Sequence, residues 1–112
     1  MNTLKNHVQL IGRLGNDPEL RNFDSGKQMT TFSLATNESY TNNQGEKVTD
    51  TQWHHVVAWG KKAQTINTYL KKGSEVAIQG KLVNRKYEKD GATKYVTEIN
   101  LSEVLMLDKK ND

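Results

Sequence analysis

The chain has 112 residues, of which 34% are hydrophobic and 26% charged, and its formal net charge at pH 7 is +3. A chain of this length forms one domain with one core, and no stretch approaches the roughly 18 apolar residues of a membrane-spanning helix. The absence of cysteine excludes disulfide bonds, a thiol nucleophile and a zinc site with cysteine ligands. Because no apolar run near the N-terminus is long enough for a signal peptide, we expect a cytoplasmic protein.

Between its glycines the chain mostly alternates apolar and polar residues, which is the pattern of β-strands. In the first half, turn signals at Asn16-Asp17-Pro18 and Asp24-Ser25-Gly26 interrupt this pattern. We therefore expect strands at residues 6–14, 28–40 and 49–59, with a short extended piece at residues 19–22.

One segment, residues 61–72, has a helical period instead. Ala63, Ile66 and Leu70 are spaced i, i+3 and i+7, so they lie on one face of a helix. Gly73 follows, and glycine is the residue that most often ends a helix. The spacing predicts one short helix between the third and fourth strands.

The last third of the chain predicts two further strands, at residues 75–87 and 93–107. Asp90-Gly91 between them is typical of a tight hairpin turn. The apolar parity of the last strand shifts halfway along it, which predicts a β-bulge near Ser102.

Five strands with a single helix between the third and fourth predict an all-β fold, a five-stranded Greek-key barrel of the OB type. Gly12 and Gly80 lie inside strands, where a small barrel needs sharp bends. An open five-stranded sheet carrying one helix is the alternative architecture.

The positive charge is concentrated between Lys61 and Lys94. This window has nine basic and three acidic residues, whereas the rest of the chain has seven basic and ten acidic ones. A basic stretch of this kind suits a polyanionic ligand. A solvated lysine-rich surface accounts for the charge equally well.

Aromatic residues lie beside charged or strongly polar neighbours at four places, namely Tyr40, Trp53, Trp59 and Tyr87. The two tryptophans share a strand parity, so they face the same side, about 20 Å apart at ~3.3 Å per residue. Aromatic rings that stack on bases, together with cationic side chains on phosphates, hold single strands without sequence preference. The alternative is that both tryptophans belong to the core, where tryptophan is usually well buried.

An enzyme is not indicated. The chain has neither a phosphate-binding G-x-x-x-x-G-K-[ST] loop nor a nucleophile elbow G-x-S-x-G. His54 and His55 are adjacent in a strand and face opposite sides, which leaves His7 as the one further imidazole for a metal site. We therefore expect no catalytic residue, no metal and no cofactor.

Five segments together resemble the bacterial single-stranded DNA-binding protein family. They are GRLGNDPELR (residues 12–21), TTFSLATNESY (30–40), TQWHHVVAWGKKAQ (51–64), YLKKGSEVAIQGKL (69–82) and NRKYEKDGATKYVTEI (84–99). The resemblance implies an OB-fold DNA-binding domain over residues 1–107, followed by a short tail at residues 108–112. It also implies a homotetramer built from dimers that binds single-stranded DNA at the nucleoid, in replication, recombination and repair.

The resemblance also assigns site residues. The family's base-stacking positions align with Tyr40, Trp53, Trp59 and Tyr87. Tyrosine stands at two positions where tryptophan is common, and Trp59 stands where phenylalanine is common, so each keeps a π face. Its phosphate-binding positions align with Arg21, Lys61, Lys71, Lys72, Arg85 and Lys86. Its subunit contacts align with Asn6, His7, Val8, Gln9 and His54.

One departure concerns the C-terminus. Members of the family often continue into a Gly/Pro/Gln-rich linker and an acidic tip that recruits other proteins, whereas this sequence ends LDKKND. Recruitment of replication and repair partners is therefore in doubt. Two alternative functions stay open: a primosomal restart protein of the same fold, and a protein-interaction module with weak nucleic-acid binding.

Overall fold

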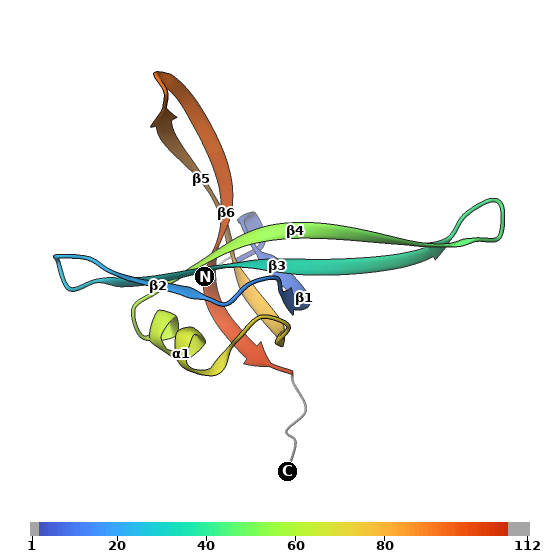
Figure 1. Cartoon of the computed structure of the whole chain (residues 1–112), viewed down its shortest axis with the longest axis horizontal. Coiled ribbons are helices and arrows are strands. Elements are labelled where there is room, and N and C mark those ends of the chain that lie inside the picture. Colours follow the sequence, from blue (N-terminus) through green and yellow to red (C-terminus); the bar gives the residue numbers. More distant parts are fainter. Residues whose placement is uncertain (1–2, 108–112) are drawn as a thin grey trace, which may run out of the picture.

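Two long two-stranded arms project from a small β-barrel in the computed structural model, which describes residues 3–107 (Figure 1). Its elements in chain order are η1 (Thr3–Lys5), β1 (Val8–Leu14), β2 (Glu19–Asn22), β3 (Gln28–Thr41), β4 (Lys47–Trp59), α1 (Lys61–Tyr69), β5 (Glu75–Lys89) and β6 (Ala92–Met106). The expected strands and helix are all present, and the short extended piece is strand β2. The expected tail at residues 108–112 lies outside the described residues.

The strands form one sheet in the order β1-β5-β6-β4-β3-β2, and an additional pairing of β1 with β3 closes a five-stranded barrel. This closure confirms the OB-type barrel and shows that the open-sheet alternative is wrong. With β2 counted, α1 lies between the fourth and fifth strands; among the five barrel strands it keeps its expected place between the third and fourth. The β4–β6 pair is parallel and the other pairs are antiparallel.

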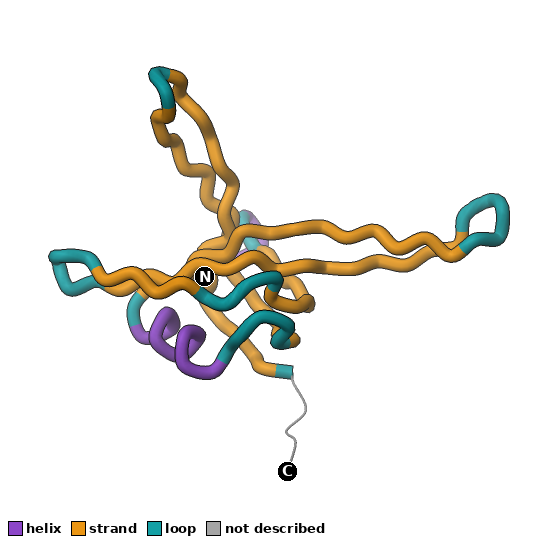
Figure 2. The backbone as a smooth tube through the Cα atoms, in the orientation of Figure 1, coloured by secondary structure: helices purple, strands orange, loops and turns teal. Residues whose placement is uncertain are grey.

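The barrel interior holds the hydrophobic core. Its central side chains, Phe32, Leu34, Val56, Val76 and Ile78, are all but inaccessible to water. They come from the alternating positions of β3, β4 and β5, because one face of each strand points inward. Ile66 of α1 joins this cluster, and the helix packs against β2, β3 and β4, which places it over one end of the barrel (Figure 2).

Helix α1 ends at Tyr69, three residues earlier than the sequence pattern predicts. Leu70 adopts an extended conformation and still reaches the core. The next residues form a turn held from outside the helix: Ser74 Oγ accepts a hydrogen bond from the Lys71 N–H (3.1 Å), and Asp17 Oδ1 accepts one from the Lys72 N–H (2.9 Å). These side-chain acceptors replace the carbonyls that another helical turn would supply.

Strand β1 begins at Val8 rather than at residue 6. The side chain of Asn6 makes the contacts that a paired backbone would make: Nδ2 donates to the Leu82 carbonyl (2.9 Å), and Oδ1 accepts from the Leu82 N–H (2.8 Å). Asn6 thus extends the sheet without strand geometry.

The predicted bulge is confirmed. Gln79 pairs with Glu103 and Gly80 pairs with Leu101, so Ser102 is the extra residue of β6. Its hydroxyl donates to the Gln79 carbonyl (3.1 Å). At Gly80 a Cβ atom would clash with the Asn100 carbonyl oxygen, and at Gly12 it would clash with that of Ala35. Both glycines therefore allow strands to approach closely where the barrel bends.

The arms are continuations of the β3–β4 and β5–β6 hairpins beyond the barrel, and they point in different directions (Figure 1). In the β5–β6 turn, Asp90 and Gly91 both have positive φ (54° and 76°), as the predicted tight hairpin requires. Within residues 3–107, no helix has the length and apolar character needed to cross a membrane.

Candidate nucleic-acid interface

A groove of about 650 Å³ lies on the outer face of the barrel, across β2, β3, β4, β5 and β6. Strand register sets its lining, because residues paired across antiparallel strands share a face. Arg21 of β2 pairs with Met29 of β3, which pairs with Trp59 of β4. The full lining is Glu19, Arg21, Phe23, Met29, Thr31, His55, Val57, Trp59, Val83, Arg85, Glu98 and Asn100.

Trp59 lines this groove and is 43% exposed. The ring of Phe23 stacks on it with 6.0 Å between ring centroids and 25° between ring planes. Phe23, itself 42% exposed, was not among the predicted site residues. One signal was available: Phe23 is two residues beyond Arg21, so the alternation that directs Arg21 into the groove also directs Phe23 there.

Trp53 lies farther along the same face of β4, where it pairs with Ala35, and is 63% exposed. Its ring covers Gly15, at which a Cβ atom would clash with the indole. The absence of a side chain at Gly15 therefore gives the ring room to lie against the β1–β2 turn. Since both tryptophans are well exposed, the alternative that they are core residues is wrong.

The two predicted tyrosines lie on different arms. Tyr87 of β5 has the strand parity of Arg85, so it continues the groove face along the β5–β6 arm. Tyr40 pairs with Val48 on the β3–β4 arm, at a parity opposite to that of Ala35 and Trp53. The structure therefore brings Trp59 and Tyr87 to one groove face, but it places Tyr40 apart from them.

The predicted phosphate-binding residues are also divided. Arg21 and Arg85 line the groove, and Lys61 lines a second hollow on the other side of Trp59. Lys71 and Lys72 lie in the turn after α1. Lys86 pairs with Tyr95, on the face of the β5–β6 arm opposite to Arg85.

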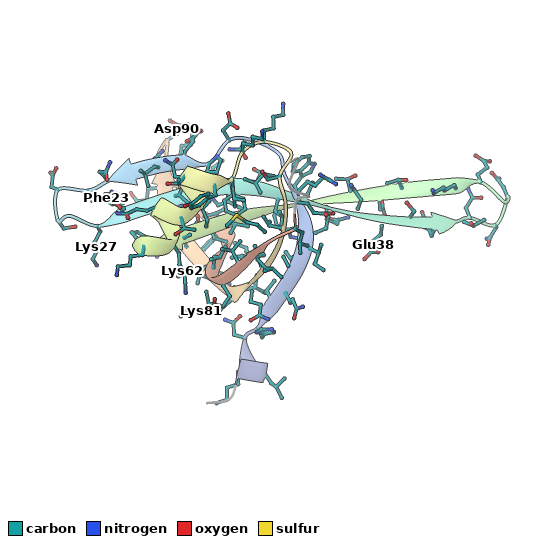
Figure 3. All side chains as sticks on the ribbon, turned by 90° about the horizontal axis from the view of Figure 1, so that it is seen from below. Phe23, Lys27, Glu38, Lys62, Lys81 and Asp90 are labelled. Carbon is teal, nitrogen blue, oxygen red and sulfur yellow. The ribbon has the colours of Figure 1, made fainter. Side chains whose placement is uncertain are left out.

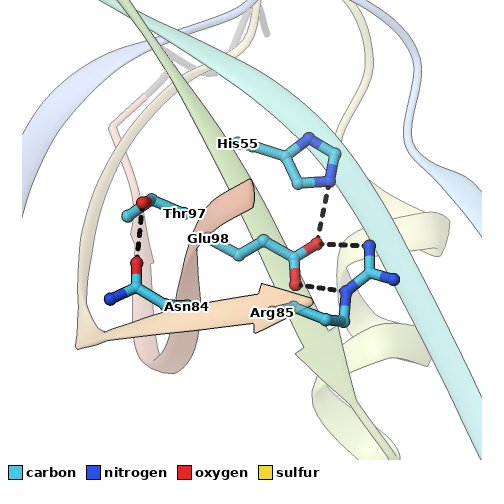
Figure 4. A network of polar contacts seen from close by, with 5 residues as sticks. All are labelled: His55, Asn84, Arg85, Thr97 and Glu98. Carbon is cyan, nitrogen blue, oxygen red and sulfur yellow. Dashed lines mark hydrogen bonds and ion pairs between the residues drawn. The ribbon is translucent and has the colours of Figure 1, made fainter. Parts of the chain in front are cut away.

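A polar network that the sequence did not reveal lies in the groove (Figure 4). The guanidinium of Arg85 donates to both carboxylate oxygens of Glu98, at 3.0 Å to Oε1 and 3.3 Å to Oε2. His55 Nε2 lies 3.2 Å from Glu98 Oε2, so it is an ion-pair partner when protonated. The side chain of Glu98 is only 10% exposed. The hydrogen bonds that Arg85 donates to Glu98, together with the negative charge of Glu98, raise the pKa of Arg85 above its ordinary value.

His54 and His55 face opposite sides of β4, as expected. His55 is in the groove, whereas His54 pairs with core residue Leu34 and its Nε2 lies 3.0 Å from the Thr36 hydroxyl. Among the described residues no group of three or more acidic or histidine side chains is placed to hold a metal ion.

Of the predicted subunit contacts, Val8 and Gln9 lie in strand β1, and Asn6 and His7 directly precede it. Strand β1 pairs with β5 from Val8 to Arg13, but with β3 only at Arg13 and Leu14. Its second edge, from Val8 to Gly12, therefore has no partner strand within residues 3–107.

Comparison with known proteins places this geometry in a family. The model of the single-strand binding protein family matches residues 5–107. Single-stranded DNA-binding protein 1 of Chlorobaculum tepidum is 45% identical over 108 residues, which are 95% of this chain and 67% of that protein. The single-stranded DNA-binding protein of Neisseria meningitidis serogroup A is 40% identical over 108 residues, 96% of this chain and 62% of that protein. The chain thus spans about two thirds of the length of these relatives.

Two solved structures have the same fold. A chain of the Plasmodium falciparum SSB complex with ssDNA superposes with a TM-score of 0.82 at 37% identity, covering 92% of this chain and 95% of that chain. A deletion mutant of the single-stranded DNA binding protein from Thermus aquaticus superposes with a TM-score of 0.80 at 28% identity, covering 92% of this chain and 50% of that one. On the extent of the family match and these identities, the chain belongs to the single-strand binding protein family.

Proposed function

We propose that the chain binds single-stranded DNA without sequence preference. The observation that carries this proposal is the exposed ring of Trp59 in a groove that also holds the cationic side chains of Arg21 and Arg85. Exposed aromatic rings next to cations are what stacked bases and a phosphate backbone require. The similar Plasmodium falciparum protein, whose structure is a complex with ssDNA, supports the same ligand.

In this mechanism Tyr40, Trp53, Trp59 and Tyr87 stack bases. Phosphates pair with Arg21, Lys61, Lys71, Lys72, Arg85 and Lys86, and the counterions released by these contacts make binding weaker as salt rises. The protein breaks no bond; it protects the strand from hairpin formation and nucleases by occupying it. We place this activity in the cytoplasm, at the nucleoid, in replication, recombination and repair.

We further propose a homotetramer built from dimers. The unpaired edge of β1 at Val8 and Gln9, together with Asn6 and His7 directly before it, offers backbone groups to a second copy, and in this proposal His54 completes the contact. The outer face of the same sheet carries an apolar row: Ile11 pairs with Ala77, which pairs with Leu105. Ile11 and Leu105 are both well exposed, so this face is suited to join two dimers. Since one OB domain covers only about 4–16 nucleotides, assembly extends the site and raises avidity.

The proposal is tested by titrating the protein with oligo-dT and with duplex DNA of the same length, at low and high salt. We expect oligo-dT alone to quench tryptophan fluorescence strongly, with affinity that falls as salt rises. The absence of both quenching and salt-dependent binding would refute strand binding and leave the protein-interaction alternative.

A further inference from the structure

We propose that Phe23 and Lys27, at the two ends of the β2–β3 turn, form a further DNA-binding subsite around Trp59. Phe23 carries a base together with Trp59 on the groove side, and Lys27 holds a phosphate together with Lys61 on the other side. This inference rests on the proposed function. It adds two residues to the proposed DNA-binding site and indicates the path of the DNA strand around Trp59.

The first observation is the aromatic pair itself. Phe23 stacks on Trp59 at 6.0 Å, yet each ring remains more than 40% exposed. A stacked pair that is buried for stability would leave less of both rings in water. The two rings instead form a short stack beside the groove, and a base can extend this stack on the ring surface that remains exposed.

The second observation is the charge on the two sides of Trp59. In the groove, Glu19 and Glu98 offset Arg21 and Arg85, and Arg85 already binds Glu98. The second hollow, of about 570 Å³, is lined by Gly26, Lys27, Gln28, Trp59, Gly60, Lys61 and Gln64, two lysines without an acid. The hollow therefore attracts phosphates more strongly than the groove does, and the groove adds apolar surface for bases at Met29, Val57 and Val83.

The third observation is that the turn is held in place. The Phe23 N–H donates to the Lys27 carbonyl (2.9 Å) and the Gly26 N–H to the Phe23 carbonyl (2.9 Å), with Gly26 at φ 87°. The Gly60 N–H donates to the Gln28 carbonyl (2.9 Å), which ties the hairpin to the residue before α1. Phe23 and Lys27 thus lie on one hairpin (Figure 3) in a fixed relation to Trp59 and Lys61, so little ordering is needed on binding.

A chain of amide side chains strengthens this attachment. Gln28 Nε2 donates to Asn22 Oδ1 (2.7 Å), and Gln28 Oε1 accepts from Gln64 Nε2 of α1. These two hydrogen bonds connect the hairpin to the helix beside Trp59.

The role of Phe23 is tested in a Trp53→Phe background, where Trp59 is the only tryptophan and its quenching reports on this site. We expect F23A and F23L to bind an oligo-dT of about eight nucleotides roughly 5- to 150-fold more weakly, which is the fold-change of one lost base stack. F23Y should bind as well as wild type because it retains a π face. Leucine keeps the apolar bulk beside Trp59, so the loss in F23L separates base stacking from support of the fold.

The role of Lys27 is tested by K27A, with K62A as the matched control. Lys62 has the same charge on α1 but faces Glu103, its Nζ lying 3.8 Å from Oε1. We expect K27A to lower the slope of log affinity against log salt by about 0.7, the value for one phosphate contact on a single strand. K62A, checked by light scattering for an unchanged oligomeric state, should leave the slope as in wild type.

Two results would overturn the subsite while leaving the proposed function intact. One is F23L binding within twofold of the parent while Trp59→Ala, made in the wild-type chain and followed through Trp53, still loses affinity; Phe23 would then only support Trp59. The other is an equal salt slope for K27A and K62A. If the unsubstituted protein fails to bind oligo-dT, the proposed function itself is refuted.

Discussion

The contacts of Glu98 determine how much of the positive charge in the groove is offset. Its carboxylate is nearly buried, accepts two hydrogen bonds from Arg85 and lies beside His55. In the proposed phosphate contact, Arg85 would therefore act as half of an ion pair, with its guanidinium held by Glu98. Because Glu98 raises the pKa of Arg85, the stabilisation from this pair is lost at the alkaline end only as the pH rises through the raised pKa of Arg85.

We expect Glu98→Gln to lower the free energy of unfolding by about 1.5–3 kcal/mol, because charge-assisted hydrogen bonds to a nearly buried group are lost. Denaturant unfolding measures this change. Glu103→Gln is the control, since Glu103 is largely exposed and its contact with Lys62 is long. This substitution should lower the free energy of unfolding by at most about 0.5 kcal/mol. Equal effects of the two substitutions would show that the network adds nothing to stability.

At the scale of elements, glycine positions allow the strands to bend into a barrel. Gly12 and Gly80 lie where the neighbouring backbone comes too close for any side chain, and Gly80 is next to the Ser102 bulge. From this bend β5 and β6 leave the barrel and become an arm. The bulge also changes which face of β6 points inward, so Val104 packs against the core while Leu105 faces water.

Gly80→Ala should destabilise the protein by about 1–3 kcal/mol, because the added methyl group clashes with a backbone carbonyl that cannot move without disturbing the ladder. Thermal unfolding followed by circular dichroism is the measurement. Gly91→Ala offers a contrast, because no atom lies close to that position and only its positive φ makes alanine unfavourable. This substitution should lower the free energy of unfolding by about 1 kcal/mol. A fully stable Gly80→Ala variant would mean that the sheet has room to adjust.

At the scale of the whole molecule, the barrel has two surfaces of different character. The groove face carries exposed aromatic and cationic side chains, whereas the outer face of β1, β5 and β6 carries the apolar row of Ile11, Ala77 and Leu105. The proposed binding of a DNA strand and the proposed assembly with further copies therefore use different residues of the chain.

Leu105→Glu should dissociate the proposed tetramer into dimers, because each copy would bring a carboxylate into an apolar contact. Sedimentation or light scattering measures the change, and affinity for long oligo-dT should fall with the loss of avidity. Tyr69→Glu alters a similarly exposed residue on α1 and should leave the oligomeric state unchanged. An intact tetramer in Leu105→Glu would show that this face does not join subunits.

The sequence by itself determined the elements, the apolar face of α1 and the bulge, because these follow from local periodicity, turn residues and the shift of parity around Ser102. It also identified the exposed aromatics Trp53 and Trp59 as candidate site residues. It did not give the early end of α1, since the acceptors for Lys71 and Lys72 include Asp17, which is far away in the chain.

Only the tertiary structure decided which side chains meet. The stack of Phe23 on Trp59, the pairing of Glu98 with Arg85 and His55, and the hollow shared by Lys27 and Lys61 each join residues of different elements. Such contacts depend on strand register and barrel closure, which bring distant segments together by packing the core. No periodicity within a single segment encodes them, because the alternation of a strand fixes its two faces and leaves open which neighbouring strand each face will meet.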